Sequence, residues 1–150
     1  MTLQNMKKML LGMSIVLLSS TTNAQTQLGA DIDGEGFNDQ SGYSVSMPDS
    51  YTVAIGARYN YGNGAQAGHV RIYSWNGAGW VQKGDDIDGE AAGDYCGISV
   101  SMPDSNTVAI GASSNGGAAV NAGHVRIFKW NGTAWTQKGL DIDGEAASDV

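Results

Sequence analysis

Acidic side chains gather around one pentapeptide, Asp-Ile-Asp-Gly-Glu, that occurs three times in this chain. Its copies occupy residues 31–35, 86–90 and 141–145, and another Asp stands four residues after each copy. Calcium ions bind oxygen ligands, above all the carboxylates of Asp and Glu. The segments are therefore candidate calcium sites. The candidate ligands in the first two copies are Asp31, Asp33, Glu35, Asp39, Asp86, Asp88, Glu90 and Asp94.

These carboxylates also have a structural interpretation. An EF-hand loop needs Gly at position 6 and Glu at position 12, but counting from Asp31 places Gly34 at position 4 and another Gly at position 12. The EF-hand pattern is therefore excluded. In an extended segment Asp31, Asp33 and Glu35 lie on one side and form a different cation site with Asp39. Alternatively, Asp33 and Gly34 form a turn, and Asp39 caps backbone N–H groups before the next strand.

Other reactive side chains are few. The single cysteine, Cys96, stands where the preceding repeat of the sequence has Ser41, which indicates a position that tolerates any small side chain and not a nucleophile. The two histidines, His69 and His124, also occupy equivalent positions of the two repeats. We expect each to form hydrogen bonds at the start of a strand, because no third histidine or second cysteine completes a zinc set or a nucleophile with its base.

The N-terminal segment, residues 1–24, predicts an export signal. Lys7 and Lys8 precede an apolar run over residues 9–18, and cleavage is predicted after Ala24. The run is shorter than the about 20 residues of a membrane-spanning helix, so the mature chain is expected to be secreted or at the cell surface, with no membrane span. It carries 6 basic against 15 acidic residues, a net charge of −9. That charge excludes a nucleic-acid partner, which requires a basic face.

An internal repeat organises the rest of the chain. The segment 31–85 aligns with 86–140 without a gap, and 35 of the 55 positions are identical. Such repetition indicates one structural unit that is used again. The expected division is a signal peptide at 1–24, the remnant of a last strand at 25–30, repeats at 31–85 and 86–140, and the start of a third repeat at 141–150.

Each repeat predicts four strands and no helix. Apolar and polar residues alternate over 43–47 and again over 69–75, and 52–57 are short and β-branched or apolar. A fourth strand is expected at 80–83, after a turn rich in Gly. A turn is also expected at Pro48 to Ser50. Four antiparallel strands in each unit match the blade of a β-propeller, so the predicted fold class is all-β.

The repeats resemble bacterial FG-GAP-type repeats, which are related to the propeller of integrin α chains. The similarity is carried by SGYSVSMPDSYTVAIGA at 41–57 and CGISVSMPDSNTVAIGA at 96–112, and it extends over 27–150. It implies propeller blades and a role in adhesion or recognition of an extracellular protein or glycan. The family's calcium loop lies between the first two strands, where this chain has only a short turn, so that metal site is not carried over. Two blades cannot close a ring, and a fragment of a longer protein is expected.

The antiparallel order of the strands predicts two different edges. The long loops at 58–68 and 113–123 share one edge with the acidic segments, and that edge is the expected binding surface. Its candidate residues are Arg58, Tyr59, Tyr61 and Asn115. The tight turns lie at the opposite edge with the pairs Trp75/Trp80 and Trp130/Trp135, which we interpret as cross-strand pairs that stabilise hairpins and not as sugar-stacking platforms.

Together these features predict an exported, non-catalytic repeat module for binding, adhesion or scaffolding outside the cell. A calcium-binding repeat module is one alternative. A non-catalytic part of a larger secreted enzyme is the other.

Overall fold

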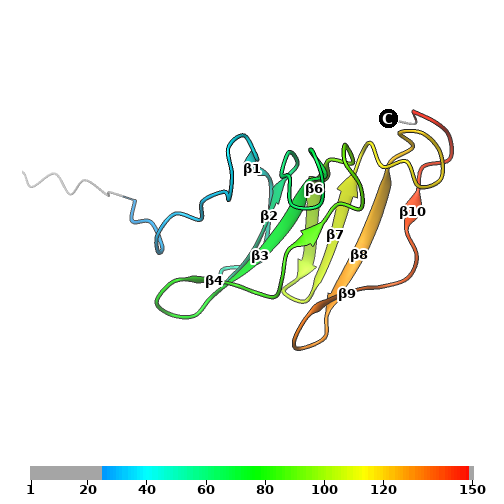
Figure 1. Ribbon diagram of the computed structural model, residues 1–150. Coiled ribbons are helices and arrows are strands. Elements are labelled where there is room, and N and C mark those ends of the chain that lie inside the picture. Colours follow the sequence, from blue (N-terminus) through cyan, green and yellow to red (C-terminus); the bar gives the residue numbers. More distant parts are fainter. Residues whose placement is uncertain (1–24, 149–150) are drawn as a thin grey trace, which may run out of the picture.

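The computed structural model describes residues 25–148, which form two antiparallel β-sheets (Figure 1). The predicted signal peptide and Asp149 lie outside the described residues. The all-β prediction is confirmed, because the described part of the chain contains ten strands and no helix. It follows that none of these residues forms an apolar helix long enough to cross a membrane.

The first sheet is formed by consecutive strands. Its order is β1-β2-β3-β4, and β5 also pairs with β3. The strands are β1 (Ser41–Asp49), β2 (Thr52–Ala57), β3 (His69–Trp75), β4 (Trp80–Gln82) and β5 (Ile87–Asp88). The predictions of strands at 52–57 and 69–75 are confirmed to the residue. The first turn was predicted at residues 48–50 but lies at Ser50 and Tyr51, because β1 continues through a register shift to Asp49. The carboxylate of Asp49 accepts the N–H of Tyr51.

The second sheet repeats the first. Its strands are β6 (Cys96–Asp104), β7 (Thr107–Ala112), β8 (His124–Trp130), β9 (Trp135–Gln137) and β10 (Ile142–Asp143). The pairing of Ser41 with Ala57, for example, recurs as Cys96 with Ala112, and the register of β2 on β3 recurs in β7 on β8. Within each repeat the same positions of the sequence pair with each other. The repeat in sequence is therefore also a repeat in strand pairing.

The outer edge of each sheet is a strand in two pieces. In the first sheet β4 pairs with Tyr73–Trp75 at the end of β3, whereas β5 pairs with His69 and Val70 at its start. Between them the chain bulges away at Gly84, whose φ of 80° is in the left-handed region that suits glycine. The second and third copies of the acidic pentapeptide therefore contribute the short strands β5 and β10, which the sequence did not predict.

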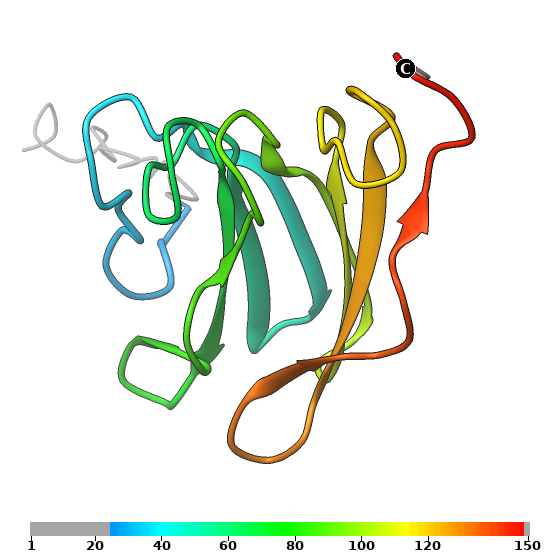
Figure 2. The same cartoon turned by 45° about the vertical axis from the view of Figure 1, so that its right-hand side comes forward.

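The two sheets pack face to face, and β6 lies against β1, β2 and β3 (Figures 1 and 2). The hydroxyl of Ser44 donates to the carbonyl of Gly97 at 2.7 Å, and the N–H of Met102 donates to the hydroxyl of Ser46 at 2.9 Å. Gly56 and Gly97 allow this approach, because a Cβ at Gly56 would overlap the carbonyl oxygen of Gly97. The main hydrophobic core lies at this contact and in the second sheet. It comprises Ala54, Val70, Ile72, Ile87, Cys96, Met102, Val108, Ile110, Ala112 and Phe128.

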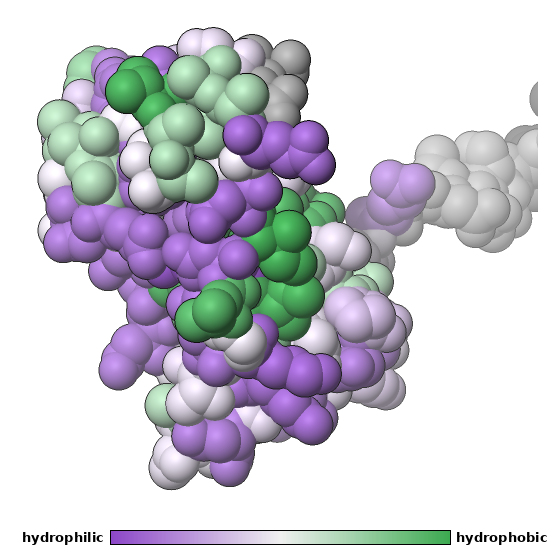
Figure 3. Space-filling model, turned by 90° about the vertical axis from the view of Figure 1, so that its right-hand side faces the viewer, coloured by the Kyte–Doolittle hydropathy of each residue, from purple (hydrophilic) through white to green (hydrophobic). Residues whose placement is uncertain are grey.

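The second sheet leaves the corresponding face uncovered. Val70 is 0% exposed and Ile87 6%, whereas their equivalents Val125 and Ile142 are 37% and 58% exposed. Figure 3 looks onto this side and shows apolar surface bordered by hydrophilic surface. A groove follows the start of β8 there, lined by residues of β8, β10 and the adjoining loops. In the first sheet the equivalent position is filled by the start of β6, where Cys96 bridges to Gly68.

The loops divide between two edges as predicted (Figure 2). The long loops after β2 and β7 lie at one edge, and the β1–β2, β3–β4, β6–β7 and β8–β9 turns lie at the other. Trp75 faces Trp80 across the β3–β4 turn with ring centroids 5.5 Å apart, and Trp130 faces Trp135 at the same separation. The prediction of cross-strand aromatic pairs is thus confirmed.

Candidate functional site

The acidic segments reach the edge of the long loops, where their last carboxylate forms part of the backbone structure. Asp39 accepts the N–H of Gly36 at 2.8 Å, and Asp94 accepts the N–H groups of Glu90 and Ala91 at 3.1 and 2.9 Å. Both side chains are buried. These two aspartates therefore cap turns, as the sequence predicted for Asp39, whereas the turn predicted at Asp33 and Gly34 is wrong, because the chain bends at residues 35–38 instead.

Two asparagines connect these caps to the long loops. Asn60 donates to Asp39 at 3.0 Å, and Asn115 donates to Asp94 at the same distance. Each amide oxygen accepts the N–H two residues later, at Gly62 or Gly117. Asn115 was predicted to face a partner, but it is only 4% exposed and holds its loop in place. That assignment is corrected, because a buried amide with these partners cannot present itself to a ligand.

The first aspartate of each pentapeptide is bound by a glutamine from the preceding turn. Gln27 donates to Asp31 at 2.7 Å, and Gln82 donates to Asp86 at 2.6 Å. The backbone carbonyl of Asp33 accepts a hydrogen bond from Arg71 at 2.8 Å. Within residues 25–148 no three acidic side chains of one segment come together, so they do not converge as the calcium hypothesis pictured them. Calcium binding by this set stays a prediction.

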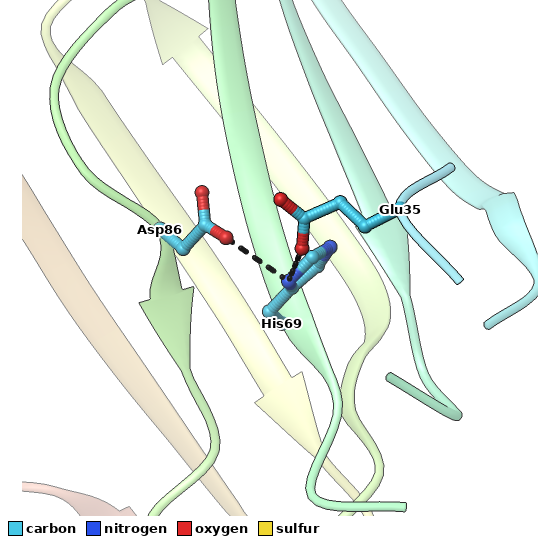
Figure 4. A group of neighbouring side chains, drawn as sticks. All are labelled: Glu35, His69 and Asp86. Carbon is cyan, nitrogen blue, oxygen red and sulfur yellow. Dashed lines mark ion pairs between the residues drawn. The ribbon is translucent and has the colours of Figure 1, made fainter. Parts of the chain in front are cut away.

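The structure instead brings together acidic residues of successive segments around a histidine (Figure 4). The Nδ1 atom of His69, at the start of β3, lies 3.4 Å from Asp86 Oδ2 and 3.9 Å from Glu35 Oε2. Glu35 comes from the segment before β1, and Asp86 from the segment between β4 and β5 of the same sheet. The other oxygen of Glu35 lies 3.4 Å from Arg71 Nη1.

The second repeat contains the same cluster. His124 Nδ1 lies 3.5 Å from Asp141 Oδ2 and 3.9 Å from Glu90 Oε2, and Arg126 Nη1 lies 3.7 Å from the other oxygen of Glu90. Within residues 25–148 these are the two places where three or more potential metal ligands meet. Sequence reasoning missed both clusters. The available signal was that each histidine follows the Glu of one pentapeptide and precedes the first Asp of the next, at the same spacing in both repeats.

Burial sets the charge state of the first cluster. Desolvation lowers the pKa of His69 from its ordinary value of 6.5, although Asp86 acts in the opposite direction. Desolvation also raises the pKa of Asp88, the next acidic residue along β5. The imidazole of His69 is therefore neutral at pH 7, which is the form that accepts a hydrogen bond or binds a metal through an unprotonated nitrogen.

The predicted loop residues form a row of aromatic and basic side chains. The guanidinium carbon of Arg58 lies 3.9 Å from the ring centroid of Tyr43 and 4.5 Å from that of Tyr59. Tyr59 in turn packs against Tyr95 of the second repeat, with ring centroids 5.5 Å apart. Tyr61 is exposed at the tip of the same loop. Arg58, Tyr59 and Tyr61 thus lie on the loop edge as predicted.

A shallow hollow joins each acidic segment to a tryptophan hairpin. Residues 30–33 line the first hollow together with Tyr73 and Trp80, and residues 85–88 line the second with Phe128 and Trp135. The indole N–H of Trp80 donates to the carbonyl of Leu28, and that of Trp135 donates to the carbonyl of Lys83. Sequence analysis placed tryptophans and acidic residues at opposite edges. The structure corrects this, because each segment runs along the sheet from one edge to the other.

The cysteine has the environment of a packed core residue. Cys96 is fully buried at the contact between the sheets. Burial raises the pKa of its thiol to about 11, even though Arg126 lies nearby. A thiol in this state is a poor nucleophile, since only the thiolate reacts.

The described residues therefore offer oxygen and imidazole ligands, a loop edge held by buried hydrogen bonds and two aromatic hollows. No protein-family model matches this chain, and no curated relative was found for it.

Proposed function

We propose that this chain is an exported, non-catalytic repeat module of β-propeller blades that binds an extracellular protein or glycan through its loop edge. The blade assignment is supported by two antiparallel sheets, each built from consecutive strands and packed face to face. On this proposal, further blades cover the apolar face at Val125 and Ile142. The chain then serves as part of an adhesion or recognition scaffold.

One observation supports the binding assignment: the buried hydrogen bonds that hold the two long loops are the same in both repeats, whereas the side chains at the surface of these loops differ. Asp39 with Asn60, and Asp94 with Asn115, hold both loops by the same buried hydrogen bonds. The residues displayed above that frame differ, since Arg58 and Tyr59 are replaced by serines in the second repeat. A rigid frame with variable exposed residues is the usual arrangement of a recognition surface.

The test exchanges residues between the repeats. In the double variant Arg58→Ser with Tyr59→Ser, the first loop receives the side chains found in the second, so its frame should be kept. Wild type and variant are applied to a glycan array and an array of extracellular matrix proteins. We expect at least one ligand for wild type and loss of that signal in the double variant.

A matched control lies at the opposite edge. Tyr51→Asn introduces the residue that the second repeat carries in the same turn, Asn106, and should leave binding unchanged. Absence of any ligand on both arrays, or a ligand lost only in Tyr51→Asn, would contradict recognition at the loop edge.

The hollows support a second candidate, direct glycan binding beside the tryptophans. Trp80 there adjoins Asp31 and Asp33. Such a pairing offers an aromatic face for a sugar ring and carboxylates for its hydroxyl groups. The same glycan array separates the candidates: Trp80→Ala would remove a glycan signal from the hollow and spare one at the loop edge, whereas Arg58→Ser with Tyr59→Ser would do the reverse.

A further inference from the structure

The two histidines have an unusual feature for buried polar groups. The side chains of His69 and His124 are each 1% exposed, and the Nδ1 atom of each has no hydrogen-bond partner. A buried polar atom without a partner costs about 1–3 kcal/mol, and native structures contain few of them. The same atom is left unpaired in both repeats, which points to a missing partner at this position and not to a local defect.

Both unpaired atoms lie near carboxylates from two separate segments, as Figure 4 shows for His69. His69 Nδ1 lies 3.4 and 3.9 Å from oxygens of Asp86 and Glu35, and the corresponding distances at His124 are 3.5 and 3.9 Å. These separations are long for hydrogen bonds. Around a zinc ion with bonds of about 2.1 Å, two ligand atoms of a tetrahedral site lie about 3.4 Å apart. The histidine–aspartate distances match this spacing, and the glutamate oxygens at 3.9 Å would move by a few tenths of an ångström to bind the same ion.

We propose that Glu35, His69 and Asp86 hold one zinc-class divalent ion, and that Glu90, His124 and Asp141 hold a second. Imidazole and carboxylate together suit zinc and neighbouring first-row metals. Calcium is less suited, since it takes about six to eight oxygen ligands and each cluster supplies two carboxylates and a nitrogen.

The arginine beside each cluster is compatible with the ion. Arg71 contacts Glu35 Oε1, whereas Oε2 is the oxygen that faces His69. The carboxylate of Glu35 thus contacts the guanidinium of Arg71 through one oxygen and would bind the ion through the other. An ion pair of this kind helps to orient a ligand carboxylate, as outer partners of metal ligands generally do. Arg126 and Glu90 repeat the arrangement.

Access to the site comes from the carboxylate side. The side chains of Glu35 and Asp86 are 51% and 25% exposed, while the histidine is covered. The remaining coordination positions therefore face solvent and take water. Each ion would connect the segment before the first strand of a sheet to the segment between its fourth and fifth strands, across the start of the third strand, and so tie the loop edge together.

The experiment uses the full chain after removal of metals with EDTA. Isothermal titration with ZnCl2 should show two zinc ions bound per chain for wild type. It should show one for His69→Gln, one for His124→Gln and none for the double variant. Titration with CaCl2 under the same conditions should give no binding that depends on the histidines. Substitution with Co2+ provides an independent reading, because visible absorption should appear in wild type and halve in each single variant.

Matched controls follow from the repeat. Asp31 corresponds to Asp86 and Asp141 and is also held by a glutamine, but it lies outside both clusters, so Asp31→Asn should retain two equivalents. Asp86→Asn can still accept the hydrogen bond from Gln82 and should lose one equivalent. It therefore tests the site even where His69→Gln changes the far-ultraviolet circular dichroism.

Three results would overturn the inference. The first is no zinc binding by folded wild type. The second is undiminished stoichiometry in the double histidine variant, which would indicate adventitious binding by surface carboxylates. The third is calcium binding in place of zinc at the same residues.

Discussion

The first and second repeats are identical at 35 of their 55 positions, yet their equivalent faces have different environments. In the first repeat β6 covers the end of β2 and the start of β3, so Val70 and Ile87 are in the core. In the second repeat Val125 and Ile142 occupy the same places in the sheet and are exposed. Identical local sequence therefore produces the same strands and pairings, but burial depends on what packs against them.

The histidine clusters do not follow this difference. Their histidine–carboxylate distances nearly coincide, at 3.4 and 3.9 Å in the first repeat against 3.5 and 3.9 Å in the second. Each cluster consists of a Glu and a His of one repeat and the first Asp of the next repeat, which is Asp86 or Asp141. Burial of the third strand therefore requires the neighbouring sheet, whereas each cluster requires only the first Asp of the following repeat.

The largest difference between the repeats is expected for the paired substitutions Ile87→Ala and Ile142→Ala. Both remove the same atoms from the same register position. Ile87→Ala should lower the free energy of unfolding by about 2–5 kcal/mol through lost burial and a cavity, and Ile142→Ala by less than about 1 kcal/mol. Urea denaturation followed by tryptophan fluorescence measures both, and equal losses would show that Ile142 is covered in solution.

The reactivity of cysteine gives the next comparison. Cys96 is buried with a pKa of about 11, raised from 9.0, so at pH 8 its thiolate fraction is about 100-fold lower than that of an ordinary thiol. In Ser41→Cys with Cys96→Ser, the thiol moves to the equivalent, partly exposed position of the first repeat. It should react with iodoacetamide about 100-fold faster. The rate for Cys96 should rise about tenfold with each pH unit below 11 while the protein stays folded; similar rates at pH 8 would contradict the covered face.

The smallest of the three effects concerns the glycines at the contact between the sheets. A Cβ at Gly56 would overlap the backbone carbonyl of Gly97, whereas at Gly111 the only close atom is the hydroxyl of Ser99, which can rotate away. Gly56→Ala should therefore destabilise the protein by about 1–3 kcal/mol and Gly111→Ala by less than about 1 kcal/mol. Thermal unfolding monitored by circular dichroism compares them. A larger loss for Gly111→Ala would mean that its face is also closed by a partner.

Much of the fold could be predicted because its signals are local. The strands at 52–57 and 69–75 follow from β-branched and alternating residues, and the paired tryptophans follow from a Gly-rich turn between them. The short strands β5 and β10 could not be recognised in this way. Their Ile-Asp sequence is too short to show a period. Each also pairs with a strand that is not its neighbour in the chain: β4 lies between β3 and β5, and β9 lies between β8 and β10.

The candidate sites were harder to predict than the strands. Tyr59 and Tyr61 could be assigned to the loop edge from topology alone, but the burial of Asn115 depends on its hydrogen bond to Asp94, which lies in a different segment of the chain. Glu35, His69 and Asp86 are far apart in the sequence and meet only because two segments fold back over the start of β3. Their common role is visible once the register is known.

The sequence by itself determined the repeat, the strands within it and the edge at which the long loops lie, since these depend on turns and on the period of neighbouring residues. Only the tertiary structure decided which copy of each apolar residue is buried and which carboxylates surround a histidine. Burial and clustering arise from contacts between distant segments, and no local pattern encodes those contacts.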